Sequence, residues 1–150
     1  VLFRSPSKTL ADCLAAEAAA GLSKGDAFAT LRRRIDELGT SLRATLDEFS
    51  SKGLRGGGYG APAKATTLMF ELGIDAEAIQ FIVDDSPWKQ GLHSPGFGIP
   101  VISGEALKAS PPDYLVVLAW NFADPIIDNN RWFQDGGGRF VVPLPELSVR

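Results

Sequence analysis

The 150-residue sequence is poor in the residues that build metal centres and nucleophilic active sites. It contains one cysteine, Cys13, and one histidine, His93. A lone cysteine cannot form a disulfide within the chain, and one Cys with one His cannot complete a four-ligand zinc site. No Ser–His–Asp, Cys–His or paired-acid pattern stands out. The sequence therefore predicts a cytosolic, metal-free chain that binds a ligand without carrying a complete active site.

Long apolar runs and an excess of positive charge are also lacking. No segment approaches the roughly 20 apolar residues that a membrane-spanning helix needs. The formal net charge is -3, the pI is near 5.1, and the longest basic run is Arg32–Arg34. Since nucleic-acid binding needs a basic stripe, we expect neither nucleic acid nor membrane as a partner. The 45% hydrophobic and 22% charged content suits one globular domain with a core.

The first third of the chain has helical patterns. Residues 7–20 are rich in alanine with spaced leucines and stop at Gly21, which predicts a short helix. A second, long amphipathic helix is predicted to begin with Ser23 as its N-cap, because apolar residues then recur every three or four positions up to Phe49. Residues 6–53 are therefore predicted to form a helical arm.

The first five residues differ in kind from the rest. Val1–Ser5 read VLFRS, the translation of one frame of a common sequencing-adapter end. We expect residues 1–5 to be an artefact of a library boundary and the natural protein to continue upstream of Pro6.

After Gly53, short apolar runs alternate with helical stretches, as in repeated strand–helix–strand units. The predicted strands are 54–59, 79–84, 114–119 and 140–143, with a weaker one at 99–102, and the predicted helices are 62–72, 104–109 and 122–134. Because parallel crossovers are right-handed, residues 54–150 are predicted to form a Rossmann-like three-layer α/β domain with a mostly parallel sheet of four or five strands. Consecutive glycines in the first strand predict that it is short or frayed.

A glycine-rich turn joins the first strand to the next helix. Residues 58–67 read GYGAPAKATT and fit G-x-G-x-x-A. Glycines let backbone N–H groups approach a phosphate, Pro62 suits the first helical position, and the helix N-terminus attracts anions. Lys64 and Thr66 add donors, but the spacing of a Walker A motif is absent. The turn predicts either a phosphate-binding loop or tight packing of strand against helix.

Acidic residues end the second strand. Asp84 lies 24 residues after Gly60, near the spacing at which Rossmann domains bind a ribose hydroxyl, which raises an NAD-binding alternative. A second interpretation is that Asp84 and Asp85 cap the loop that follows. That polar loop carries Lys89, which either pairs with a phosphate or is an ordinary surface lysine.

Two further residues follow the most apolar strand, YLVVLA. Trp120 and Asn121 come at the carboxyl edge, where ligands of such sheets bind. The alternative is that Trp120 packs on the sheet edge and Asn121 caps the next helix. His93 is interpreted as a surface or hydrogen-bonding residue.

Five motifs, in order and spacing, resemble the C-terminal domain of S-adenosylmethionine-dependent sugar C-methyltransferases that act on thymidine diphosphate hexoses. They are YGAPAKATT, VDDSPWKQG, SPGFGIPV, PDYLVVLAWNFAD and GGGRFVVPLPE. The resemblance covers almost everything from Ser7 onward. It implies an enzyme of deoxysugar biosynthesis with an N-terminal zinc-binding module, a central S-adenosylmethionine-binding domain and this nucleotide-sugar-binding domain. The catalytic residues are implied to lie outside this chain, which alone is expected to be inactive.

The resemblance also implies site residues. The diphosphate would contact the glycine turn with Lys64, and the sugar-nucleotide cleft would be lined from the loop after the second strand and from Trp120 and Asn121. The full predicted substrate-binding set is Gly58, Gly60, Ala61, Lys64, Thr66, Asp84, Lys89, Gln90, Gly91, Trp120 and Asn121. The sequence departs from the family pattern at Leu92-His93 and Phe97-Gly98, so the resemblance does not specify which sugar is bound. A stand-alone NAD-binding module and a non-catalytic interaction domain are the alternative functions.

Overall fold

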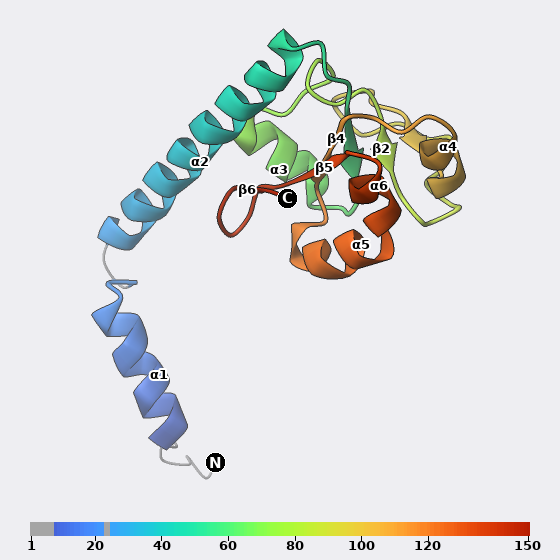
Figure 1. The fold of residues 1–150 in the computed structure, drawn as a ribbon. Helices are drawn as coiled ribbons and strands as arrows, with labels where there is room; N and C mark the ends of the chain where they lie inside the picture. Colours follow the sequence, from blue (N-terminus) through green and yellow to red (C-terminus); the bar gives the residue numbers. More distant parts are fainter. Residues whose placement is uncertain (1–7, 23–24) are drawn as a thin grey trace. The chain divides into compact units, whose positions relative to one another are not determined.

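The computed structural model describes residues 8–22 and 25–150 (Figure 1). The predicted adapter segment 1–5, the first residue of the predicted short helix and the predicted N-cap Ser23 lie outside the described residues. The chain divides into two compact units, Val1–Asp36 and Glu37–Arg150, and each is described by itself. Among the described helices, none combines the length and the apolar character that crossing a bilayer requires.

The first unit is helical. Helix α1 spans Lys8–Ala19 and buries none of its residues, and Gly21 follows it with φ of +70°. Helix α2, Gly25–Ser51, begins in this unit and exposes Phe28 and Leu31 there. Both predicted helices of the arm are confirmed. The second half of α2 belongs to the other unit, where its apolar stripe is buried at Leu42, Leu46 and Phe49.

The second unit is built on one six-stranded sheet in the order β3-β2-β1-β4-β5-β6. Strands β1 to β5 are parallel to one another, and β6 is antiparallel to β5. The strands are β1 Gly56–Tyr59, β2 Ile82–Val83, β3 Val101–Ile102, β4 Tyr114–Val117, β5 Arg139–Val142 and β6 Ser148–Val149. The predicted mostly parallel α/β sheet is confirmed, and its order is that of Rossmann domains. The sheet has one strand more than the predicted four or five, because β6, which pairs antiparallel with β5, was not predicted.

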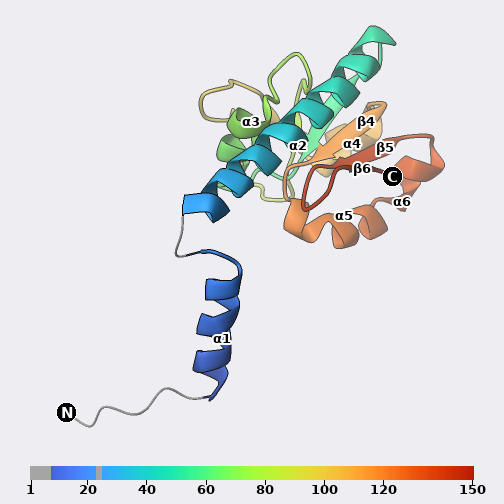
Figure 2. The same ribbon diagram turned by 90° about the vertical axis from the view of Figure 1, so that its left-hand side faces the viewer.

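Helices cover both faces of this sheet (Figures 1 and 2). Helix α3, Ala65–Leu72, lies on one face with the second half of α2. Helices α4, Gly104–Ala109, α5, Ala123–Asn129, and α6, Arg131–Asp135, lie on the other, where their apolar side chains share a core with β1, β2, β4 and β5. A short 3-10 helix, Trp120–Phe122, connects β4 to α5.

Two predicted helices need correction. The predicted helix 122–134 is broken at Asn130, whose side chain donates to the carbonyl of Ile126 at 2.8 Å and to the hydroxyl of Tyr59 at 3.1 Å. The predicted helix 62–72 begins at Ala65, so Pro62 lies in the turn before it and does not occupy the first helical position. Helix α4 has the predicted bounds.

The glycines of β1 are there because the neighbouring side chains leave no space. A Cβ on Gly56 would lie 2.3 Å from the carbonyl oxygen of Ala78 and 2.3 Å from the Tyr114 ring, and one on Gly57 would lie 2.6 Å from the Phe81 ring. The strand is short, as predicted, but it is central and buried at every residue. Its glycines are therefore required by packing in the middle of the sheet.

Helix α3 is held in place by α2. A Cβ on Gly39 would lie 3.6 Å from the Cα of Leu72, so the two helices approach closely. The Arg43 guanidinium donates to the carbonyl of Leu72 at 3.1 Å, and Gly73 ends α3 with φ of +68°. These contacts fix the helix whose first turn follows the glycine-rich turn.

We predict that Gly56→Ala destabilises the fold. Overpacking of this kind costs about 1–3 kcal/mol, and the neighbours here include a backbone carbonyl that cannot move freely. Urea unfolding measures the loss. The control is Gly104→Ala at the start of α4, where a Cβ meets nothing within 4 Å. Equal stability of the two variants would contradict the packing argument.

Candidate functional site

The candidate site lies at the carboxyl edge of the sheet, where β1 and β4 are neighbours. From β1 the sheet continues to β2 and β3, whereas from β4 it continues to β5 and β6. The connections after β1 and β4 therefore diverge, and ligands of open α/β sheets bind at such a switch point. The predicted substrate-binding residues all fall in the Glu37–Arg150 unit.

Three predicted residues meet across the switch point. The Lys64 ammonium group, just before α3, donates a hydrogen bond to the side-chain oxygen of Asn121. It also lies 4.7 Å from the centroid of the Trp120 ring, within the range of a cation–π contact. The Asn121 side chain thus contacts Lys64 and does not cap the next helix, since α5 begins without a side-chain cap. The connections after β1 and β4 are joined through Lys64.

Asp84 joins the glycine turn to the loop after β2. Its carboxylate accepts from the backbone N–H of Ala61 at 2.7 Å and of Ser86 at 2.9 Å, and it pairs with the Lys89 ammonium at 3.1 Å. The Gln90 amide donates to the Asp84 carbonyl at 3.0 Å. Burial alone would raise the pKa of Asp84, but the two N–H groups and Lys89 outweigh it, so the pKa is lowered and the charged form is favoured.

These contacts change the roles expected for the glycine turn. The N–H of Ala61 donates to Asp84, so it is not available for a phosphate. Gly60 has φ of +86°, and a Cβ there would lie 2.6 Å from the Ala119 side chain, so this glycine lets the turn pack against the end of β4. Gly58 is buried within β1. Of the residues predicted to hold a diphosphate, Lys64 is the one whose side chain is polar and exposed.

Two pockets adjoin the carboxyl edge. The first, which we call the α3 pocket, has a volume of about 510 Å³ and contains the predicted residues Ala61, Thr66 and Lys89. Its other lining residues are mostly apolar: Pro62, Ala63, Ala65, Met69, Ile82, Leu92, Pro95 and Val101, with His93 and Ser94. Gly91 lines neither this pocket nor the second one, which is described next. Its N–H donates to the carbonyl of Val101 at 2.9 Å, which fixes the loop after β2.

The second pocket, which we call the α4–α5 pocket, has a volume of about 490 Å³. Gln90 is its one residue from the predicted set. The others are Tyr59, Asp85, Ser103, Gly104, Glu105, Lys108, Pro125, Ile126, Asn129 and Asn130. Tyr59 could have been suspected from its place inside the glycine motif, whereas nothing in the local sequence marks Asn130. Within residues 8–22 and 25–150, no group of three or more His, Cys, Asp or Glu side chains could hold a metal ion.

Comparison with known proteins gives two matches. The family described as the C-methyltransferase C-terminal domain matches residues 3–145. C-methyltransferase NovU of Streptomyces niveus is 36% identical over 156 aligned residues, which cover 99% of this chain and 37% of that protein. The chain thus spans little more than a third of that relative's length.

We predict that Asp84→Asn destabilises the domain at neutral pH. The variant loses the ion pair with Lys89 and turns an amide donor toward a backbone N–H, a loss of about 1–3 kcal/mol. A lowered pKa in the folded protein means that this stabilisation is present above the ordinary aspartate pKa and disappears as the pH falls through the lower, folded value.

Urea unfolding of both proteins at pH 7 and at successively lower pH below 4 measures the difference, which should shrink with acidification. Asp135→Asn, at the exposed end of α6, is the matched control and should change little at any pH. A loss for Asp84→Asn that is independent of pH would contradict the assigned charge.

Proposed function

This chain belongs to the C-methyltransferase C-terminal domain family, and we propose that it binds the nucleotide-diphosphate keto-sugar on which an S-adenosylmethionine-dependent C-methyltransferase acts. S-adenosylmethionine, and the zinc of the implied N-terminal module, are assigned to parts of the enzyme outside this chain. The chain alone is proposed to bind the substrate without methylating it.

The observation that carries the proposal is the difference between the two lysines of the site. Lys89 is paired with the buried carboxylate of Asp84, which offsets its charge. Within the described part of the chain, the partners of Lys64 are both neutral, the Asn121 amide and the Trp120 ring, so its positive charge is available to an anion. Its ammonium has three donors, and one is used by Asn121. Two donors remain for phosphate oxygens, and they lie at the start of α3, where the helix also favours negative charge.

The α3 pocket suits the base of the same nucleotide. Residues 61–63, directly before Lys64, line it, and Met69, Leu92 and Val101 give it apolar walls. A flat pyrimidine ring buries mostly apolar surface and needs few polar contacts, which Thr66 and Lys89 can supply. We therefore assign the diphosphate to Lys64 and the base to the α3 pocket.

The NAD-binding alternative is less well supported. Dinucleotide-binding domains use the acid after the second strand for ribose and the N–H groups of the glycine turn for pyrophosphate. Here these two groups bond to each other, since the Ala61 N–H donates to Asp84. A dinucleotide would have to break that contact, whereas a nucleotide-sugar held by Lys64 leaves it intact.

In the proposed reaction, a proton would leave the carbon next to the keto group, and S-adenosylmethionine, held elsewhere in the enzyme, would supply a methyl group to that carbon, with S-adenosylhomocysteine as the leaving group. The residues that move this proton are assigned to the rest of the enzyme. The contribution of this domain is to hold the substrate by its nucleotide, so that the reacting carbon is presented in one orientation.

Calorimetric titration of the chain with thymidine diphosphate, a thymidine diphosphate keto-sugar, NAD and S-adenosylmethionine tests the proposal. We expect the two thymidine ligands to bind and the other two not to. Lys64→Met should weaken binding of both thymidine ligands about tenfold, as expected for one charge-assisted contact, and the wild-type affinity should fall with added salt.

The matched control is Lys52→Met, an exposed lysine near the end of α2 that pairs with Glu48. It should leave the affinity unchanged. Binding of NAD alone would overturn the proposal, as would failure of all four ligands to bind. Binding of thymidine ligands with equal strength by Lys64→Met would overturn the assignment of the diphosphate to Lys64.

A further inference from the structure

The α4–α5 pocket contains a tyrosine that the site described above does not use. Tyr59 is the last residue of β1, and its ring is buried in the core that the sheet shares with α4, α5 and α6. Only 7% of the residue is exposed, yet it lines the pocket. The glycine turn follows directly, so Tyr59 and Lys64 are separated by one short turn.

Asn130 fixes the direction of the Tyr59 hydroxyl. Its amide nitrogen donates to Tyr59 at 3.1 Å and to the carbonyl of Ile126 at 2.8 Å, and its oxygen accepts from the Trp132 indole at 3.3 Å. Both ends of the buried amide are thus engaged, which sets its orientation. Because the hydroxyl accepts from Asn130, its own proton must point elsewhere. Asn130 lies at the break between α5 and α6.

The hydroxyl proton has no short partner within the described residues. The nearest recorded acceptor is the Asp85 carboxylate at 3.5 Å, beyond the usual 2.5–3.0 Å of an O–H···O bond. Burial is the main cause that raises the pKa of Tyr59, so the hydroxyl keeps its proton at neutral pH. A ligand oxygen that lies beside this pair, within hydrogen-bond distance of both Tyr59 and Asp85, would accept from the first and donate to the second, as an alcohol can and a phosphate oxygen cannot.

The charges of the pocket also indicate an uncharged ligand. It is lined by two carboxylates, Asp85 and Glu105, and one ammonium group, Lys108. An excess of negative charge disfavours phosphate. The amides of Gln90 and Asn129 offer neutral donors and acceptors, and this mixture of groups matches several hydroxyls on one ring.

The remaining wall is apolar. Pro125 and Ile126 lie on α5 and offer a surface on which the C–H face of a sugar ring can pack. The volume of about 490 Å³ lies within the range of small-molecule sites. Polar groups together with an apolar surface are the combination that a ring with hydroxyls on its edge requires.

We infer that the α4–α5 pocket binds an uncharged, hydroxylated sugar ring through the Tyr59 hydroxyl and the Asp85 carboxylate. This rests on the proposed function for the source of the ring. With the base in the α3 pocket and the diphosphate at Lys64, the ring on the other side of the diphosphate is the hexose of the same nucleotide-sugar. The ligand then spans the carboxyl edge, with its phosphates at Lys64 and one sugar ring on the α4–α5 side.

The test compares two ligands by calorimetric titration of the full chain: thymidine diphosphate, and thymidine diphosphate glucose as the probe that adds a hexose. Tyr59→Phe and Asp85→Asn should each weaken binding of the second ligand about five- to tenfold. Weakening with the glucose conjugate alone identifies the ring as the hexose. Equal weakening with thymidine diphosphate would identify it as the pentose and would overturn both the hexose assignment and the placement of the base in the α3 pocket.

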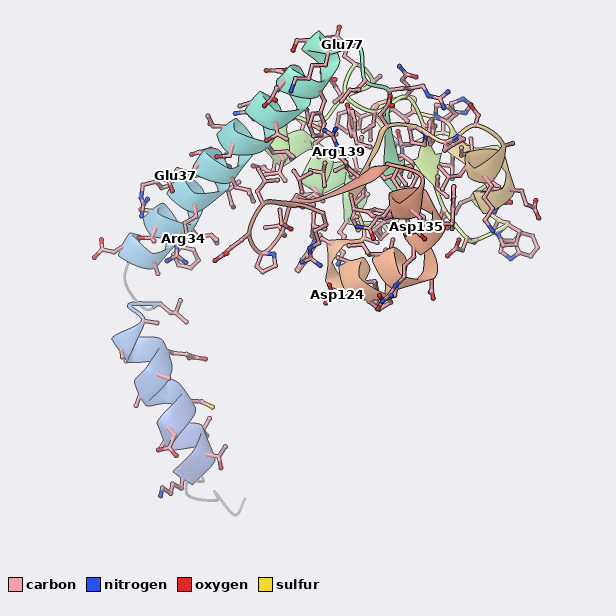
Figure 3. All side chains as sticks on the ribbon, in the orientation of Figure 1. Arg34, Glu37, Glu77, Asp124, Asp135 and Arg139 are labelled. Atoms are coloured by element: carbon pink, nitrogen blue, oxygen red, sulfur yellow. The ribbon has the colours of Figure 1, made fainter. Side chains whose placement is uncertain are left out.

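Two controls keep the outcome interpretable. Asp85 is exposed, so Asp85→Asn should not disturb folding, and thermal unfolding checks this for Tyr59→Phe. Asp135→Asn, at the end of α6 and outside the pocket, should bind both ligands like the wild type (Figure 3). Unchanged affinities in both folded pocket variants overturn the inference. If Lys64→Met weakens binding in the same series, the proposed function survives that result. If the unsubstituted chain binds neither ligand, the proposed function fails as well.

Discussion

The buried carboxylate of Asp84 is the contact on which the geometry of the carboxyl edge depends. A buried charge is stable only when it is paired and hydrogen-bonded, and Asp84 obtains its partners from both loops beside it. The glycine turn supplies the N–H of Ala61, and the loop after β2 supplies Ser86 and Lys89. Neither loop can move without leaving the carboxylate under-bonded. The start of α3 and the position of Gln90 both follow from this constraint.

The same contact divides the edge by charge. The Asp84 carboxylate offsets the positive charge of Lys89. Lys64, whose partners are neutral, therefore carries the positive charge that remains at the switch point. On the α4–α5 side, Asp85 and Glu105 outnumber Lys108. Phosphates and sugar rings differ in the charge they accept, so this division matches phosphate to Lys64 and an uncharged ring to the α4–α5 pocket. An edge with both lysines unpaired would attract phosphate on both sides of the turn and would not order the ligand.

The sequence predicts the α/β sheet and most of its helices because those elements have periodic apolar patterns and local stop signals. Gly73 ends α3, and α4 has the expected bounds. The failures have non-local causes. Asn130 breaks a helix by reaching Tyr59, which is 71 positions away in the chain. The glycines of β1 look costly locally, yet they are explained by Ala78, Tyr114 and Phe81. Likewise, the hydrogen bond between the Ala61 N–H and Asp84 joins the glycine turn to the end of β2, so neither sequence motif alone could predict it.

Close packing holds the side chains at the carboxyl edge in position, which lowers the entropy cost of binding a ligand there. Gly60 brings the turn against Ala119, so the connections after β1 and β4 are in contact. Lys64 is then held by Asn121 and Trp120, and the Tyr59 hydroxyl by Asn130. Each side chain that is fixed beforehand spares the ordering cost of binding, which is about 0.5–1.5 kcal/mol for a flexible side chain. The proposed positioning role gains from such rigidity, since it consists in restricting the orientations that the reacting carbon can take.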